Sequence, residues 1–297
     1  MDIKKKHVVL LKDLVRLLRP HQYTKNLFIF LPAFFNGQIL HVVIVINCFV
    51  SFVAFCMVAS AVYILNDIRD VNEDRIHPTK KHRPIASNRI SKRTGYIIML
   101  VLLVIGLVIS FRYKGFAALF TLYLILNILY SYKLKHIALV DVTIISIGFV
   151  IRLFVGSVVA DIPLTNWIVV MTFLLALFLG FAKRRDDIII FQNIGQRVRK
   201  NMVGYTLEFI NVSTAMIASV IIVAYIMYTL QPETILRFKS DKLYLTALFV
   251  VIGILRYMQI TYVENKSGSP SETLLRDRFL QIVLLCWISS FVFILYG

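Results

Sequence analysis

Charged residues are scarce in this chain. Only 16% of its 297 residues are Asp, Glu, Lys or Arg, whereas 59% are hydrophobic, and the mean hydropathy is +0.78. This composition excludes an ordinary soluble domain and is typical of a protein that crosses the bilayer many times. Apolar runs recur that are long enough to cross a hydrocarbon core of roughly 30 Å as helices. The sequence therefore predicts an all-α polytopic membrane protein with about nine spans, at residues 25–40, 42–65, 95–111, 115–132, 138–160, 165–183, 206–230, 242–262 and 278–296.

Other features are few or missing as well. Cys48, Cys56 and Cys286 lie inside apolar runs without metal-ligand spacing, so we assign them no chemistry. No stretch rich in Gly, Ser or Pro separates domains, which predicts a single integral membrane domain over residues 1–297. Residues 1–24 alternate charged and apolar positions in place of the apolar core of a cleavable signal peptide. They predict an amphipathic helix on the membrane surface.

Acidic residues number 16 against 33 Lys and Arg, which gives a net charge of +17. On the nine-span scheme, 26 of the basic residues lie on the side of the N terminus and five, at positions 112, 114, 237, 239 and 242, on the other. This asymmetry indicates membrane orientation and not nucleic-acid binding. We predict a multi-pass protein of the plasma membrane with a cytoplasmic N terminus and an outer C terminus. Two cytoplasmic loops stand out, at residues 66–94 and 184–205, and their positions four spans apart suggest an internal duplication.

The first of these loops begins with three aspartates at spacing i, i+3, i+7. Asp67, Asp70 and Asp74 share one face if the second span continues as a helix past Asn66. Neighbouring carboxylates repel each other, and a cation relieves the repulsion. Oxygen donors without His or Cys favour Mg²⁺, which takes further ligands from substrate phosphates. The pattern predicts a site for Mg²⁺ and a diphosphate, with a solvated loop of paired acids and bases as the alternative.

Basic residues follow the aspartates. His77, Lys80, Lys81, His82 and Arg83 can neutralise the outer oxygens of a bound diphosphate.

Arg152 lies near the middle of the fifth predicted span, where an unpaired guanidinium costs at least about 2.5–3.5 kcal/mol. Gly148 and Gly156, four residues to either side, allow close approach of a backbone or a ligand. Asp141 lies earlier on the same helix face and can line the same cavity. Arg152 is predicted either to bind a substrate phosphate or to form a structural ion pair.

The end of the sixth predicted span carries both signs of charge, in the sequence KRRDD at residues 183–187. Lys183 and Arg184 suit phosphate binding, and Asp187 suits an acidic ligand or orienting group. A basic flank that only sets the topology is an equal alternative.

The residues Asn66, Asp67, Asp70 and Asp74 form the pattern NDxxDxxxD, which resembles the first signature of the UbiA superfamily of intramembrane prenyltransferases. More narrowly, nearly the whole chain resembles the decaprenyl-phosphate phosphoribosyltransferase branch. The stretches that carry this resemblance are RPHQYTKN at 19–26, LNDIRDVNEDRIHPTKKHRPIAS at 65–87, YSYKLKHIALVD at 130–141, GFVIRLFVG at 148–156, GFAKRRDD at 180–187 and LLRDR at 274–278.

The resemblance implies about nine helices around a polar cavity that is open to the cytosol. It implies Mg²⁺ as cofactor, phosphoribosyl pyrophosphate as donor and a polyprenyl phosphate lipid as acceptor; a homo-oligomer is left open. The resemblance and the charges of the loop together give the candidate catalytic residues, which are Asp67, Asp70, Asp74, Lys80, Lys81 and Arg83. The three aspartates are also the candidate metal ligands. The candidate substrate-binding residues are Lys25, Asn26, Asn66, Tyr130, Lys135, Asp141, Arg152, Lys183, Arg184 and Asp187.

The sequence departs from the branch at two positions. Asn88 stands where Gly is expected, and Asn is the residue that next best tolerates a left-handed turn. Asp187 stands in place of Glu and is one methylene shorter.

Two alternatives remain open. A prenyltransferase of the same fold would move an isoprenyl group from its diphosphate to an aromatic or other small acceptor. A transporter of anions would also explain Arg152, but it would not need an aspartate triplet.

Overall fold

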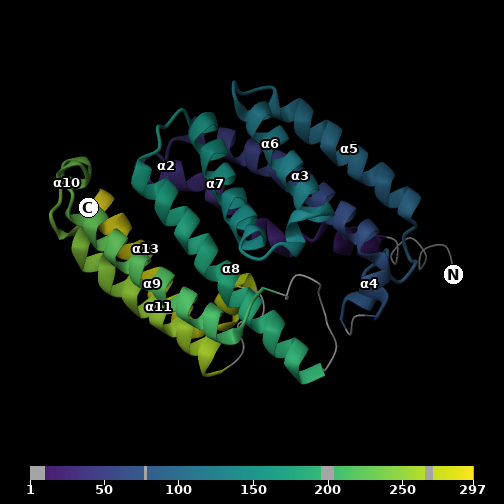
Figure 1. The fold of residues 1–297 in the computed structure, drawn as a ribbon. Coiled ribbons are helices and arrows are strands. Elements are labelled where there is room, and N and C mark those ends of the chain that lie inside the picture. Colours follow the sequence, from purple (N-terminus) through teal and green to yellow (C-terminus); the bar gives the residue numbers. More distant parts are fainter. Residues whose placement is uncertain (1–10, 77–78, 195–203, 265–269, 297) are drawn as a thin grey trace, which may run out of the picture. The chain divides into compact units, whose positions relative to one another are not determined.

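The computed structural model describes residues 11–76, 79–194, 204–264 and 270–296 (Figure 1). All regular elements within these ranges are α- or 3₁₀-helices, which confirms the predicted all-α class. Three parts of the predicted features lie outside the described residues: residues 1–10 of the amphipathic segment, His77, and residues 195–203 of the second loop.

The chain forms two compact units, although its sequence shows no linker between them. Unit 1 comprises Met1–Lys135 and Ile151–Pro163, and unit 2 comprises His136–Val150 and Leu164–Gly297. The division falls inside helix α7 (Val140–Ala160).

Unit 1 contains a helical segment at residues 11–18 and the first half of the named helices. These are η1 (Pro20–Phe30), α2 (Leu31–Phe35), α3 (Val42–Arg69), α4 (Val71–Ile76), η2 (Lys80–His82), α5 (Lys92–Ser110), α6 (Phe116–Tyr132) and the second part of α7. Local signals explain two of the boundaries. The Ser91 side chain caps α5 by accepting a hydrogen bond from the amide of Thr94 (3.0 Å), and Gly115, with φ 91°, allows the turn into α6.

Unit 2 contains the first part of α7 and the later helices. These are α8 (Asn166–Ile194), α9 (Leu207–Leu230), α10 (Pro232–Phe238), η5 (Lys242–Thr246), α11 (Ala247–Tyr262), α12 (Pro270–Arg276) and α13 (Arg278–Tyr296). Thr206 caps α9 by accepting from the amide of Phe209 (3.1 Å), and Asp277 accepts from the amide of Leu280 (2.8 Å) at the start of α13.

Six helical segments of the described chain are long and apolar enough to cross a membrane. They are Val42–Arg69, Lys92–Ser110, Val140–Ala160, Asn166–Ile189, Leu207–Leu230 and Lys242–Tyr262, and two shorter apolar helices cover Phe116–Tyr132 and Arg278–Ile294. The first predicted span, at 25–40, differs: it consists of the 3₁₀-helix η1 and the five-residue α2, with Pro32 in the first turn of α2. Proline lacks an amide donor and is tolerated in the first turn of a helix, so Pro32 fits the change from η1 to α2 at Leu31. The predicted count of nine spans is therefore not confirmed.

Helix α8 also differs from the prediction, because it continues through residues 184–194, where a loop was expected. Lys183, Arg184 and Asp187 consequently project from a helix.

A small apolar cluster in unit 1 fixes the segments that carry the aspartates. Leu17 from the helical segment at residues 11–18, Ile64 and Ile68 from α3, Val71 from α4 and Ile85 from the following loop are all buried together. The amphipathic segment thus packs one face against α3, while its Leu11 and Val15 are exposed.

Candidate active site

The three predicted metal-binding aspartates lie where α3 gives way to α4. The amide of Asp70 donates to the carbonyl of Asn66 (2.9 Å), and the amide of Asp74 donates to the carbonyl of Asp70 (2.8 Å). Helix α3 nevertheless ends at Arg69, and Asp70 has a non-helical conformation (φ −88°, ψ 12°). The helix therefore continues past Asn66, as expected, but is interrupted at the second aspartate.

Arg83 joins the first aspartate to the third. Its Nη1 lies 3.1 Å from Oδ1 of Asp67 and 2.6 Å from Oδ2 of Asp74. Asp67 also accepts a hydrogen bond from Nη2 of Arg19. Both carboxylates are almost completely buried. Buried carboxylates need compensating charge, and here two arginines supply it.

Arg19 reaches Asp67 because the chain turns sharply after residue 18. Its backbone is left-handed (φ 55°), which costs a non-glycine residue roughly 1–2 kcal/mol. Burial lowers the pKa of its guanidinium, and the charge of Asp67 opposes this shift. The guanidinium also lies 5.1 Å from the ring centre of Tyr63.

Asp70 has a different partner from the other two aspartates. Its Oδ1 lies 2.6 Å from Nζ of Lys135, a residue that follows α6. The neighbouring Asn66 accepts a hydrogen bond from the Ser131 hydroxyl at the end of α6. The structure thus brings the predicted residues Asn66 and Lys135 to the aspartates. Tyr130 is partly exposed, and its side chain has no hydrogen-bond partner within the described ranges.

The basic loop after α4 is held by its own contacts. Lys80 and Lys81 lie on η2, and Lys81 is exposed. Arg75 donates from Nε to the carbonyl of Ala86 (3.1 Å) and from Nη2 to Oδ1 of Asn88 (2.8 Å). Asn88 has φ 59°, which confirms the left-handed turn predicted for it.

A second group of cations in unit 1 surrounds Lys25 of η1. The pKa of Lys25 is lowered to about 8 because its ammonium is buried and because Arg152 and Arg19 repel a further positive charge. Lys25 lies outside the six candidate spans, and the described residues give it no ion-pair partner. A bound anion would relieve this repulsion.

Arg152 of α7 is one of the two arginines whose charge lowers the pKa of Lys25. Its Nε donates to Oδ1 of Asn26 (2.7 Å) and its Nη2 to the hydroxyl of Tyr123 (2.9 Å). The guanidinium also lies 5.0 Å from the ring centre of Phe55 and 4.9 Å from that of Tyr123, which fits cation–π contact. Asn26 and Arg152, both predicted from the sequence, are therefore direct partners.

Helix α7 approaches η1 closely because it has glycine at position 156. A Cβ atom at Gly156 would lie 2.0 Å from the carbonyl oxygen of Ile29. This close packing explains one of the two glycines that flank Arg152 and fixes η1, the helix that carries Lys25 and Asn26.

Unit 2 contains its own arginine between two carboxylates. Arg184 donates from Nε to Oδ2 of Asp141 (2.6 Å) and from Nη1 to Oδ2 of Asp187 (2.6 Å). The hydroxyl of Tyr205 donates to Oδ1 of Asp141 (2.7 Å) and accepts from the amide of Leu139 (2.7 Å). Burial and the bond to Asp141 raise the pKa of Tyr205, so it stays a donor.

These contacts change the interpretation of the second cluster. Arg184 was predicted to bind a substrate phosphate, but it is almost completely buried and neutralises two acids. Asp187 reaches Arg184 although it is shorter than Glu. The neighbouring Lys183 is only partly buried.

The aspartates of unit 1 fit a hard divalent cation by their chemistry. Asp67, Asp70 and Asp74 offer only carboxylate oxygens, the donors that Mg²⁺ takes. Within the described ranges no three His, Cys, Asp or Glu side chains converge on one point; Arg83 pairs with two of the carboxylates and Lys135 with the third. These contacts must open before a cation can share the three carboxylates.

Three residues with direct contacts to the site were missed in the sequence: Arg19, Tyr123 and Tyr205. Arg19 begins the stretch RPHQYTKN at residues 19–26, and its place directly before Pro20 could have marked it as a candidate site residue. Tyr123 lies within an apolar run and Tyr205 follows a basic segment, so nothing local distinguishes either from a packing residue.

Comparison with known proteins identifies the family. The sequence profile of the UbiA prenyltransferase family matches residues 28–280. The chain belongs to the UbiA prenyltransferase family. It is 32% identical over 292 residues to a decaprenyl-phosphate phosphoribosyltransferase of Mycolicibacterium smegmatis, with 95% of this chain and 92% of the relative covered. The corresponding protein of Corynebacterium glutamicum is 28% identical over 288 residues, with 95% and 86% covered.

Solved structures of the family agree with the fold. A UbiA homologue from Archaeoglobus fulgidus, bound to DMAPP and Mg²⁺, superposes with a TM-score of 0.71 at 17% identity, with 95% of this chain and 98% of that chain covered. The UbiA-family chain described here is thus an integral, multi-pass membrane protein and an enzyme of the transferase class.

Proposed function

We propose that this enzyme transfers a 5-phosphoribosyl group from phosphoribosyl pyrophosphate to a polyprenyl phosphate of the decaprenyl type. A phosphate oxygen of the lipid forms a bond to C1 of the ribose, and the bond from C1 to the diphosphate oxygen breaks. Pyrophosphate leaves with the electron pair. Since the attacking phosphate is already an anion, no strong general base is needed, and positioning carries much of the rate.

One observation in unit 1 carries this proposal: a carboxylate site and a cation site lie next to each other. Arg19 bonds to Asp67 and is also close enough to Lys25 to lower its pKa. Lys25 in turn is close to Arg152. Such an arrangement suits two phosphate-bearing substrates, one bound through a metal at the aspartates and one bound by cations.

The carboxylate site would hold the diphosphate of the donor. Asp67, Asp70 and Asp74 would hold Mg²⁺, which supplies charge neutralisation for the leaving group when bound. Arg83 would then exchange its carboxylate contacts for contacts with the diphosphate, and Lys80 and Lys81 would add to the stabilisation of the negative charge that develops there.

The cation site would hold a second phosphate. Arg152 presents a fork whose orientation is fixed by Asn26 and Tyr123, and Lys25 adds an ammonium. Either the lipid phosphate or the 5-phosphate of the ribose fits this chemistry.

The full-length similarity to two decaprenyl-phosphate phosphoribosyltransferases supports the choice of substrates. A prenyltransferase acting on an aromatic acceptor remains the second candidate, because the Archaeoglobus fulgidus homologue was solved with an isoprenyl diphosphate. An uncharged acceptor would leave the buried ammonium of Lys25 without an anionic ligand, and this favours the phosphoribosyl reaction.

The test is a reconstituted reaction. Purified protein is incubated with Mg²⁺, phosphoribosyl pyrophosphate and decaprenyl phosphate, and the lipid is analysed by mass spectrometry with pyrophosphate measured in parallel. We expect a phosphoribosylated lipid and one pyrophosphate for each transfer. Product only with an isoprenyl diphosphate and an aromatic acceptor would overturn the proposal in favour of the prenyltransferase, and no pyrophosphate from any donor would favour transport.

A further inference from the structure

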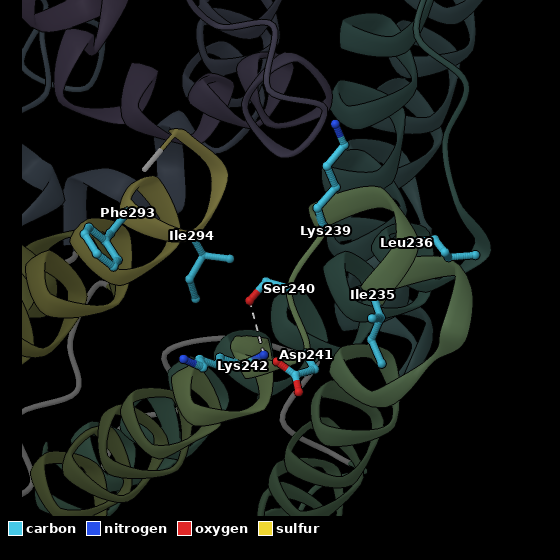
Figure 2. A pocket seen from close by; sticks show the side chains of 8 residues that line it. All are labelled: Ile235, Leu236, Lys239, Ser240, Asp241, Lys242, Phe293 and Ile294. Carbon is cyan, nitrogen blue, oxygen red and sulfur yellow. Dashed lines mark hydrogen bonds between the residues drawn. The ribbon is translucent and has the colours of Figure 1, made fainter.

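Unit 2 contains a cavity that the proposed reaction does not use. It has a volume of about 690 Å³ and lies at the segment that joins α9 to α11 and at the end of α13 (Figure 2). Its lining consists of Ile235, Leu236, Lys239, Ser240, Asp241, Lys242, Phe293 and Ile294. None of these residues belongs to either carboxylate cluster or to the group around Lys25.

The cavity combines cations with exposed apolar side chains. In Figure 2, the side chains of Lys239 and Lys242 leave the segment in different directions, with Ser240 between them. Neither lysine has an ion-pair partner in the described ranges, and the cavity is lined by a single acid, Asp241. Leu236 is 77% exposed and Phe293 is 76% exposed. An amphipathic ligand with an anionic head and apolar chains matches such a lining.

The charge of this segment is not explained by membrane topology. Five Lys and Arg residues are predicted on the outer side of the membrane, and three of them are Arg237, Lys239 and Lys242. Basic residues on that side work against the predicted orientation. The segment follows the candidate span that ends at Leu230 and reaches Lys242, where the next candidate span starts. A segment that joins two spans is expected at the depth of lipid head groups.

We propose that this cavity binds the phosphate head group of an anionic diacyl phospholipid of the bilayer. Lys239 and Lys242 pair with the phosphate after their flexible side chains, which diverge in Figure 2, turn toward it. The Ser240 hydroxyl is available as a donor, and Leu236 and Phe293 contact the acyl chains. A polyprenyl phosphate offers a similar head group. We assign the cavity to the bilayer phospholipid because its lining shares no residue with the sites proposed for the reaction.

The Ser240 hydroxyl already accepts a hydrogen bond from the amide of Lys242 (3.2 Å). This contact leaves its proton available to a ligand, and it holds Lys242 close to Ser240 before any lipid binds.

The experiment compares a double variant, Lys239→Gln with Lys242→Gln, against a matched control, Arg112→Gln with Lys114→Gln. The control removes two cations from the same predicted side of the membrane, at residues that do not line the cavity. Full-length protein in detergent is titrated with phosphatidylglycerol, phosphatidylcholine or decaprenyl phosphate, and binding is measured by native mass spectrometry and by the shift in melting temperature. Inorganic phosphate alone serves as the probe for the head group without chains.

We expect the double variant to bind phosphatidylglycerol about tenfold or more weakly than the wild type and the control to differ by less than about twofold. Phosphatidylcholine should bind weakly to all three proteins. Melting temperature in detergent and phosphoribosyl transfer should remain near wild type in both variants, which separates loss of the lipid site from misfolding. A second variant, Phe293→Ala, should weaken the binding of phosphatidylglycerol without changing the shift in melting temperature that inorganic phosphate causes.

Three results would overturn the proposal. The double variant could bind phosphatidylglycerol as tightly as the wild type does. Phosphatidylcholine could bind equally well, which would indicate a purely apolar site. Decaprenyl phosphate could displace phosphatidylglycerol from the wild type but not bind the double variant, which would assign the cavity to the substrate lipid.

Discussion

At the scale of single residues, Asp67 is the most constrained of the three aspartates, because it is buried and bonded to both Arg19 and Arg83. Replacement of Asp67 by Asn keeps its size and removes the charge that would hold a divalent cation. We expect turnover to fall by about 100-fold or more, and EDTA to abolish wild-type activity.

The matched control for Asp67 is Glu73→Gln, since Glu73 is an exposed acid on α4 outside the cluster. It should retain nearly full turnover. Full activity of the wild type in EDTA would contradict the metal assignment, whatever the variants do.

Lys25 gives the reaction a pH dependence. Its pKa is lowered from 10.5 to about 8 by burial and by Arg152 and Arg19, so the ammonium that we propose to bind phosphate is lost as the pH rises through about 8. We expect kcat/KM to fall over this range and Lys25→Arg to move the fall to higher pH. Lys114→Arg, at an exposed position, should leave the profile unchanged.

The titration of Lys25 would not make the protein unfold at high pH, so unfolding through this group would not explain a loss of activity there. The unfolded chain holds the proton up to a pH near 10.5, whereas the folded chain releases it near 8. Between these values the unfolded state binds more protons, so this group makes folding more favourable as the pH rises. A melting temperature that falls in parallel with activity between pH 8 and pH 9 would point to another cause.

A substitution of Arg152 tests whether this residue acts in substrate binding or only in the packing of the protein. Arg152→Met removes a buried charge along with its hydrogen bonds to Asn26 and Tyr123. We expect transfer to be nearly eliminated while the melting temperature stays the same or rises, because the cost of burying the charge also disappears. Activity and melting temperature should be measured on the same preparation. A large drop in melting temperature with activity retained in the folded fraction would show that Arg152 is structural.

At the scale of elements, the contact between α7 and η1 depends on Gly156. In Gly156→Ala the new Cβ would meet the Ile29 carbonyl at 2.0 Å, so η1 must shift. Since η1 carries Lys25 and Asn26, we expect a lower melting temperature and a raised KM for the phosphate-bearing substrates. Gly253→Ala is the control, because its Cβ would have an ordinary contact of 3.6 Å in α11; it should be neutral or stabilise by up to about 1 kcal/mol. Equal effects of the two substitutions would contradict this account.

The helices also show which parts of the fold could be predicted from the sequence. Long apolar runs predicted α3, α5, α7, α9 and α11 closely, because bilayer thickness dictates their length. The pattern at Asn66–Asp74 predicted a site at the end of α3, yet it could not show that Asp70 pairs with Lys135 while Asp67 and Asp74 share Arg83. Those pairings join residues up to 65 positions apart, and local spacing holds no information about them.

At the scale of the whole molecule, the orientation in the membrane stays a prediction from charge. Single cysteines introduced at Arg93 and at Glu233, both exposed, should react with a membrane-impermeant maleimide from opposite sides. In intact cells only the cysteine at Glu233 should be labelled, and the cysteine at Arg93 only after the membrane is opened. Native Cys286 is exposed and should be replaced by Ser first. Labelling of Arg93→Cys in intact cells would reverse the predicted topology.

The arginine that bridges Asp67 and Asp74 has a consequence for the order in which ligands associate. With Arg83 in place, the carboxylates are already neutralised, so a divalent cation arriving alone would have to displace a guanidinium and leave it without an anion. A cation arriving together with a diphosphate gives that guanidinium a new partner at once. The two ligands should therefore show positive heterotropic linkage: in calorimetric titrations, each should bind markedly more tightly when the other is present, and by the same factor.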